Sequence, residues 1–126
     1  MQKAIVSPGA EVFLRTPLPK SIASKASRVG LITNHTGVLP NLRPTYDVLA
    51  ERYTLVALFS PEHGVRGDVD AGGDVPDSID AATGLPVYST YGPSGNAAYR
   101  KMGELDCIFF DIQDVGARYY TYQYTM

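Results

Sequence analysis

Four short apolar runs along the chain predict buried β-strands, and polar residues follow each run at once. The runs cover residues 28–33, 55–59, 85–88 and 107–112. Runs of this length suit a strand and are too short for a helix of ordinary length. The third run contains Pro86, which favours an edge position in the sheet or the first residue of a strand.

Two segments between these runs carry apolar residues at the spacing of an α-helix. Residues 44–52 begin with a proline, which suits the first turn of a helix, and residues 96–105 precede the last apolar run. The apolar positions are Tyr46, Leu49 and Ala50 in the first segment and Ala98, Met102 and Leu105 in the second. Strands that alternate with helices predict an α/β fold, in which a mainly parallel sheet has flanking helices and right-handed crossovers.

The remaining segments lack a clear period. Residues 1–18 hold a short apolar stretch between prolines and are predicted to form an extended arm packed on the domain. Residues 19–27 are predicted to form a short helix or turn. Residues 68–83 are rich in Gly, Asp and Ala and are predicted to form a long surface loop over the site. A last helix is expected to begin near Arg118.

The composition is that of one compact globular domain. The chain has 126 residues, 44% of them apolar and 19% charged, which allows roughly two-thirds of the unfolded surface to be buried. The net charge is −2 and no block of like charges occurs, which argues against nucleic acid and membrane surfaces as partners. No apolar run approaches the ~18 residues that a membrane span needs. The lone Cys107 lies in an apolar run and is predicted to be a buried structural thiol.

The C-terminal residues suggest a longer protein. The last nine residues carry four tyrosines and end without a helix cap, a glycine or a polar tail. Tyrosines are costly to leave on a fraying end, so we expect them to face a partner surface. The chain is therefore expected to be the N-terminal piece of a longer protein. If these C-terminal tyrosines are exposed, they are expected to favour self-association of the chain.

Each predicted strand ends in a polar turn that contains glycine, and these turns cover residues 33–37, 60–64, 89–92 and 111–116. In a parallel sheet all carboxyl ends lie at one edge, so the turns are expected to converge on one crevice. The second turn is the richest, because a carboxylate, an imidazole and then a guanidinium follow a buried strand. The candidate groups are Asn34, His35, Glu62, His63, Arg66, Asp111, Gln113, Asp114 and Arg118.

Several kinds of chemistry fit these groups. Carboxylates from neighbouring strands could act as acid and base on a glycosidic bond. Some of these candidate groups could instead offer nitrogen and oxygen ligands to the metal ion of a metal-dependent hydrolase. The sequence matches no dedicated metal-binding motif. The ligands would be His35, Glu62, His63, Asp111 and Asp114. A non-catalytic sugar-binding module would use the same groups for hydrogen bonds. Each residue also has a plain structural interpretation, such as ending a strand or capping a loop.

Nucleotide-binding motifs are missing from the places where they would be expected. The Rossmann fingerprint G-x-G-x-x-G belongs between the first strand and its helix, where this sequence has Thr-Asn-His-Thr-Gly. The sequence also has no Walker motif and no Gly-x-Ser-x-Gly elbow. Neither a nucleotide nor any other cofactor is therefore expected.

Four sequence blocks surround the predicted turns. They are Gly-Leu-Ile-Thr-Asn-His-Thr-Gly at 30–37, Leu-Phe-Ser-Pro-Glu-His-Gly-Val-Arg-Gly at 58–67, Thr-Gly-Leu-Pro-Val-Tyr-Ser-Thr-Tyr-Gly at 83–92 and Phe-Asp-Ile-Gln-Asp-Val-Gly-Ala-Arg-Tyr-Tyr-Thr-Tyr at 110–122. In type and order these blocks resemble the peptidoglycan exo-β-N-acetylmuramidases, the NamZ/YbbC-like proteins. The match is specific, because the blocks cover most of residues 28–126.

The resemblance implies a Rossmann-like, three-layer N-terminal domain and a smaller C-terminal domain, with the active site in the cleft between them. It also implies that residues 1–126 are the N-terminal domain and that the C-terminal domain is absent from this chain. It implies release of terminal N-acetylmuramic acid from the non-reducing end of peptidoglycan fragments, in cell-wall turnover and recycling. The implied partner is thus a glycan that contains muramic acid. The family also implies a periplasmic or secreted protein, although no signal peptide is visible at the start of this chain.

The resemblance also suggests roles for the candidate residues. Glu62 is the candidate general acid/base catalyst, with His63 beside it in the catalytic pair. The residues expected to bind substrate are Asn34, His35, Arg66, Asp111, Gln113, Asp114, Arg118 and Tyr119. Our own hypothesis is that Arg66 or Arg118 binds the lactyl carboxylate of muramic acid, since a charge-assisted contact suits that group.

Overall fold

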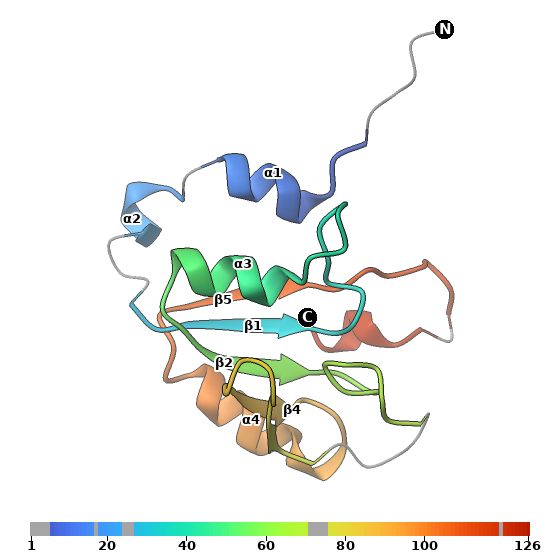
Figure 1. Cartoon of the computed structure of the whole chain (residues 1–126). Helices are drawn as coiled ribbons and strands as arrows, with labels where there is room; N and C mark the ends of the chain where they lie inside the picture. The colour runs from blue at the N-terminus through green and yellow to red at the C-terminus, as the bar shows by residue number, and fades with distance from the viewer. Residues whose placement is uncertain (1–5, 17, 24–26, 71–75, 119) are drawn as a thin grey trace, which may run out of the picture.

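The computed structural model describes residues 6–16, 18–23, 27–70, 76–118 and 120–126. One five-stranded sheet carries helices on both faces (Figure 1). The strands are β1 (Val29–Thr33), β2 (Leu55–Ser60), β3 (Ser78–Ile79), β4 (Pro86–Ser89) and β5 (Cys107–Asp111). The helices are α1 (Gly9–Arg15), α2 (Lys20–Ala23), α3 (Thr45–Arg52) and α4 (Gly95–Met102), with the 3-10 turns η1 (Gly92–Ser94) and η2 (Tyr122–Tyr124). Within the described ranges, no helix is long and apolar enough to cross a membrane.

The four apolar runs form the four parallel strands of the sheet, whose order is β3-β4-β2-β1-β5. Strand β1 pairs with both β2 and β5, and β2 pairs with β4. The prediction of an α/β fold with a mainly parallel sheet is therefore confirmed. The short strand β3 pairs antiparallel with β4, inside the segment predicted as a long loop. Residues 71–75 of that segment lie outside the described residues.

Each face of the sheet carries its own hydrophobic cluster. The α3-side cluster joins strands β1, β2 and β4 to α3, and its buried members are Val29, Leu31, Tyr46, Leu49, Leu55, Leu58, Val65 and Val87. The α4-side cluster joins the same central strands to α4, and its buried members are Ile32, Ala57, Phe59 and Ala98. Figure 1 shows α1 and α3 on one side of the sheet and α4 on the other. The central strands are thus buried on both faces, as the continuous apolar runs predict.

The N-terminal segment contradicts the prediction of an extended arm, because it contains helix α1. Arg15 pairs with Glu11 one turn earlier, a spacing that supports a short helix. Phe13 packs against Tyr53 and Phe109, with 6.2 and 4.9 Å between ring centroids. The segment does pack on the domain as expected, but it does so as a helix whose aromatic residue covers β5.

Two smaller expectations are also corrected. Ala50, expected on the apolar face of α3, is exposed, and the buried positions of that helix are Thr45, Tyr46, Val48 and Leu49. In the described part of the C-terminal segment, no helix begins near Arg118, and the chain forms the 3-10 turn η2 instead. The short helix or turn expected within residues 19–27 is α2.

Strand β5 lies at the edge of the sheet and is well covered on one face only. Cys107 and Phe109 pack against the α3-side cluster. On the opposite face, Ile108 and Phe110 are each 37% exposed. The thiol of Cys107 is therefore half-buried rather than buried as predicted. Burial and the neighbouring Asp106 raise its pKa above the ordinary value.

Candidate functional site

The polar turns that follow the parallel strands lie together at the carboxyl ends of those strands, where η2 also lies (Figure 1). A groove of about 600 Å³ opens there, within the ~300–1,000 Å³ typical of small-molecule sites. Four of the predicted site residues line it, namely His35, Glu62, His63 and Gln113. The other lining residues are Thr36, Gly67, Val115, Tyr120, Thr121 and Tyr122. We call this cavity the histidine groove.

The loop that follows β2 carries Glu62 and His63 and is folded tightly on itself. Pro61 is fully buried at its start. The backbone of His63 and Gly64 is left-handed, with φ angles of 74° and 76°. Glycine adopts this conformation readily and histidine more easily than most residues, so the pair reverses the chain within two residues. The N–H of Gly64 donates to the C=O of Pro61 at 3.2 Å, which closes the turn.

His63 is held by two hydrogen bonds to Val69, at the far end of the same loop. Its Nδ1 lies 2.9 Å from the C=O of Val69, and the N–H of Val69 donates to the C=O of His63 at 3.3 Å. A carbonyl oxygen can only accept, so Nδ1 carries the proton and Nε2 is the acceptor of the neutral ring. The loop therefore presents an acceptor nitrogen and the carboxyl group of Glu62 to one groove.

Asn34 is buried at the end of β1 and belongs to a network that joins the first and last strand exits. Its Oδ1 accepts hydrogen bonds from the N–H and the hydroxyl of Thr36, at 2.9 and 2.6 Å. The hydroxyl oxygen of Thr36 accepts in turn from the N–H of Gln113 at 3.0 Å. These bonds fix the orientation of the Asn34 amide. Asn34 thus supports the wall of the histidine groove from beneath and does not line it.

Tyr122 lines the groove although it is not among the predicted site residues. It is buried, and its ring meets that of Tyr120 edge-on at 5.7 Å between centroids. Burial raises the pKa of its hydroxyl, Asn34 lowers it, and the charges of Tyr120 and Glu62 raise it further. The run of tyrosines was the available signal, but the turn η2 decides which of them faces inward. Tyr122 thus places a protonated hydroxyl close to Glu62.

His35 packs against Gly67, which brings the exits of β1 and β2 into contact. A Cβ added to Gly67 would lie 2.5 Å from Nδ1 and 2.9 Å from Cγ of His35. Gly67 also has a φ of 71°, a conformation that side chains disfavour. The last glycine of the Glu-His-Gly-Val-Arg-Gly sequence is therefore required both by its backbone and by the ring that lies on it.

Gly67→Ala is expected to displace the His35 ring and to lower the free energy of unfolding by about 2–3 kcal/mol. Gly84→Ala is the matched control, because Gly84 has a φ of 69° and no described atom lies within 4 Å of its added Cβ. The control carries the backbone strain of about 1 kcal/mol without the clash. Urea unfolding and the NMR signals of the His35 ring measure the difference. Equal destabilisation with unmoved ring signals would contradict the contact.

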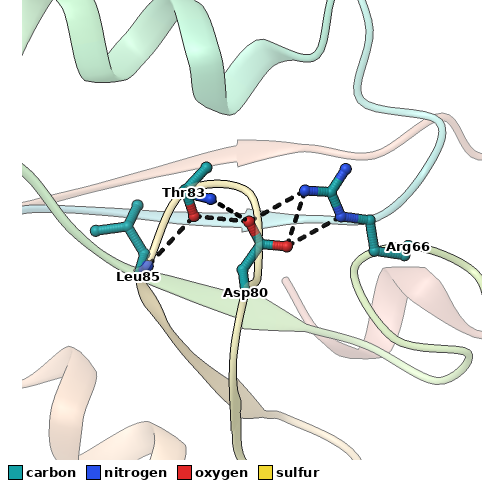
Figure 2. A network of polar contacts seen from close by, with 4 residues as sticks. All are labelled: Arg66, Asp80, Thr83 and Leu85. Carbon is teal, nitrogen blue, oxygen red and sulfur yellow. Dashed lines mark hydrogen bonds and ion pairs between the residues drawn. The ribbon is translucent and has the colours of Figure 1, made fainter.

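The structure turns Arg66 away from the histidine groove. Its Nε and Nη2 donate to the carboxylate of Asp80 at 2.9 and 3.1 Å (Figure 2). Its guanidinium also lies 5.1 Å from the centre of the Tyr46 ring. Asp80 is buried and accepts two further hydrogen bonds, from the N–H and the hydroxyl of Thr83 at 2.9 and 2.7 Å. This network ties the loop that carries Glu62 to the turn before β4.

Acid is expected to weaken this network. Burial raises the pKa of Asp80, but the hydrogen bonds from Thr83 and Arg66 outweigh it and hold the pKa below the ordinary value of 3.8. A carboxylate with a lowered folded pKa stabilises the fold above its unfolded pKa, and this contribution disappears as the pH falls through the folded pKa. Below about pH 4 the free energy of unfolding should therefore fall, and less steeply in Asp80→Asn than in wild type. Urea unfolding across this pH range measures both slopes, and equal slopes would contradict the prediction.

The remaining predicted residues do not line the groove. The carboxylate of Asp111 accepts a hydrogen bond from the hydroxyl of the first residue of α3, on the α3 side of the sheet. Asp114 is exposed, and its Oδ1 accepts from the N–H of Gly116 at 2.6 Å. Arg118 is exposed in the turn before η2. Tyr119 lies outside the described residues.

The donor set of the groove is suited to hydrogen bonding and proton transfer. Among the described residues, Glu62 is the one carboxylate that lines it, beside two imidazoles, an amide and several hydroxyls. In the same part of the chain, no three His, Cys, Asp or Glu side chains are grouped so as to hold a metal ion. Polar groups of this kind, beside the rings of Tyr120 and Tyr122, can orient a polyhydroxylated ligand.

Fold and groove together define an α/β domain whose polar site lies at the carboxyl edge of a parallel sheet and draws its carboxylate and one imidazole from a single loop. The chain belongs to the family described as "Exo-beta-N-acetylmuramidase NamZ, N-terminal", which matches residues 29–126. This match confirms the resemblance that the four sequence blocks indicate.

Individual relatives are considerably longer than this chain. Peptidoglycan beta-N-acetylmuramidase NamZ of Bacillus subtilis (strain 168) is 51% identical over 104 residues, which are 81% of this chain and 25% of that protein. A crystal structure of a DUF1343 family protein from Bacteroides fragilis NCTC 9343 has a TM-score of 0.73 and 43% identity, over 95% of this chain and 29% of the other. A second DUF1343 protein of that organism has a TM-score of 0.57 and 38% identity, over 79% and 24%. The chain thus spans about a quarter of the length of these relatives.

Proposed function

We propose that the protein to which this domain belongs is an exo-β-N-acetylmuramidase. It removes terminal N-acetylmuramic acid from the non-reducing end of peptidoglycan fragments, a reaction of cell-wall turnover and recycling. The observation that carries the proposal is Glu62 in the histidine groove, on a loop within the region that the family matches. The Bacillus subtilis relative, which shares this region, is named as a peptidoglycan β-N-acetylmuramidase.

Glu62 is the group that donates a proton to the oxygen of the scissile bond. Glycosidases use a carboxylic acid to protonate the leaving oxygen while positive charge develops at the sugar ring. The half-buried Glu62 lies in the groove wall, where its charge raises the pKa of the Tyr122 hydroxyl. His63 offers Nε2 to a sugar hydroxyl or to the attacking water beside the carboxyl group.

The lactyl carboxylate distinguishes N-acetylmuramic acid from other amino sugars, and arginine pairs with such a group in a charge-assisted contact. The guanidinium of Arg66 is already paired with Asp80. Of the two arginines of our hypothesis, Arg118 is therefore the one that we assign to the lactyl group. His35 and Gln113, which line the groove, bind the hydroxyl and N-acetyl groups of the sugar.

Residues 1–126 form the N-terminal, Rossmann-like domain of this enzyme. A glycosidase of the usual kind needs two carboxyl groups. Among the described residues, Glu62 supplies one carboxyl group to the groove. The matched region is 25% of the Bacillus subtilis relative. We therefore place the second catalytic group and the opposite wall of the cleft on the remainder of the longer protein.

The test is an assay of the full-length protein with a chromogenic β-glycoside of N-acetylmuramic acid, beside the matching glycoside of N-acetylglucosamine. We expect release from the muramic acid glycoside and little from the other. Binding of the sugar without release would identify a sugar-binding module instead. Release that EDTA abolishes and a divalent ion restores would identify a metal-dependent hydrolase. Either of these results would overturn the proposal.

A further inference from the structure

Glu62 lines two cavities rather than one. Besides the histidine groove, a second cavity of about 310 Å³ has Glu62 in its wall. Four of the residues that line this second cavity are tyrosines, namely Tyr91, Tyr99, Tyr122 and Tyr124. We call it the tyrosine cleft. The groove and the cleft share Glu62, Thr121 and Tyr122, so these residues form the wall between them.

The tyrosine cleft is lined by the loop after β2, the exit of β4, helix α4 and residues 121–125. The N–H and the hydroxyl of Thr90 both donate to the C=O of Ser60, at 2.8 and 2.9 Å, which joins the exit of β4 to the last residue of β2. The hydroxyl of Ser89 donates to the C=O of Tyr91 at 3.1 Å and accepts from its N–H at 3.2 Å. The backbone of Tyr91 is thereby fixed. Tyr91 is 36% exposed and Tyr99, from α4, is 50% exposed, so both have ring surface available to a ligand.

The two cavities differ in the polar side chains that they offer. The histidine groove contains His35 and His63 in addition to Glu62. Among the described residues, no lysine, arginine or histidine lines the tyrosine cleft. With the amide of Gln113 and the hydroxyl groups that also line it, the groove offers more hydrogen-bonding partners for a sugar that carries both N-acetyl and lactyl groups. A neutral sugar, whose ring has an apolar face, is favoured against the tyrosine rings, which combine apolar area with a hydroxyl for hydrogen bonding.

We propose that the tyrosine cleft binds the neutral sugar on the leaving side of the scissile bond, N-acetylglucosamine, while the terminal N-acetylmuramic acid occupies the histidine groove. This inference rests on the proposed function. The acid that protonates a glycosidic oxygen must reach the atom that links the two sugars. A carboxyl group in the wall between two cavities meets that requirement, with one sugar in each cavity.

The reaction then runs across this wall. Glu62 donates its proton to the bridging oxygen, and the bond between that oxygen and C1 of N-acetylmuramic acid breaks. N-acetylglucosamine leaves from the tyrosine cleft with the new hydroxyl. Water supplies the hydroxyl of C1, and the proton that water loses restores Glu62. The sum is hydrolysis, with one water consumed and two sugars released.

The test compares two substrates of the full-length protein that differ on the leaving side. N-acetylmuramic acid β-linked to N-acetylglucosamine fills both cavities, whereas the β-fluoride of N-acetylmuramic acid fills the groove alone. Tyr91→Ala and Tyr99→Ala are each expected to lower the ratio of kcat/KM for disaccharide over fluoride roughly tenfold. Phe110→Ala is the control, since Phe110 is 37% exposed and lines neither cavity, and it should leave the ratio unchanged.

The outcomes separate this inference from the proposed function. Tyrosine variants that slow both substrates equally would overturn the inference and leave the enzyme proposal intact. If wild type hydrolyses neither substrate, the proposed function fails. Binding of N-acetylglucosamine to the full-length protein, measured by NMR, then tests whether the tyrosine cleft binds this sugar. Binding to wild type that is lost in Tyr91→Ala supports the cleft, and no binding to wild type overturns it.

Discussion

Glu62→Gln is expected to reduce the release of N-acetylmuramic acid by the full-length protein by about 10²–10⁴-fold in kcat, the range that general acid catalysis contributes. Glutamine keeps the shape of the side chain but has no proton of suitable acidity for the leaving oxygen. Binding of the sugar should be retained, because His35, His63 and Gln113 still line the groove. The measurement is steady-state hydrolysis of a chromogenic muramic acid glycoside, together with the affinity for free N-acetylmuramic acid.

Glu104→Gln is a matched control for the loss of one carboxylate. Glu104 is exposed, pairs with Lys101 and Arg28 after α4 and lines neither cavity, so its substitution should leave the rate unchanged. Urea unfolding of both variants shows whether either substitution disturbs the fold. A Glu62→Gln protein that is folded and hydrolyses the glycoside at the wild-type rate would remove Glu62 from the reaction.

Asp80→Ala is expected to lower the free energy of unfolding by about 2–3 kcal/mol. The substitution leaves the N–H of Thr83 and two donors of Arg66 without their acceptor. Arg66 is 43% exposed and recovers some hydration, which keeps the loss below that of a fully buried pair. Equilibrium urea unfolding at neutral pH measures the change.

Smaller changes in the same network should rank below Asp80→Ala. Thr83→Val removes one hydroxyl donor and is expected to cost about 1 kcal/mol. Asp70→Asn, at an exposed position of the same loop region, should be neutral within about 0.5 kcal/mol. An Asp80→Ala protein that unfolds at the same urea concentration as Asp70→Asn would show that the network contributes no stability.

Most of the fold could be predicted from the sequence, because the strands are short apolar runs and each ends at a polar turn. The convergence of the turns was predicted only in part. The exits of β1, β2 and β5 bring His35, Glu62, His63 and Gln113 to one groove, whereas the exit of β4 lines the tyrosine cleft instead. The helix α1 was not predicted, because a seven-residue helix has a weak periodic signal and depends on the packing of Phe13. Its one local sign was the Glu11–Arg15 spacing.

The direction of individual side chains was harder to predict than the position of the turns. Arg66 follows the turn that carries Glu62, but its partner Asp80 lies 14 residues further along the chain. No local sequence pattern predicts an ion pair between residues so far apart. Asp111 did carry a signal. In a strand, residues two apart share a face, so Asp111 points to the same side as Cys107 and Phe109, which pack against the α3-side cluster.

The strand order affects how the nascent chain folds. Strand β1 lies between β2 and β5. Both edges of β1 can therefore be paired only after β5, the last strand in the sequence, has been synthesised. At ~5–20 residues per second, synthesis from the end of β2 to the end of β5 takes roughly 3–10 s. During that interval one edge of β1 has no partner strand and is open to pairing with other chains. The histidine groove, which needs the exits of β1, β2 and β5 together, is therefore among the last parts of the domain to form.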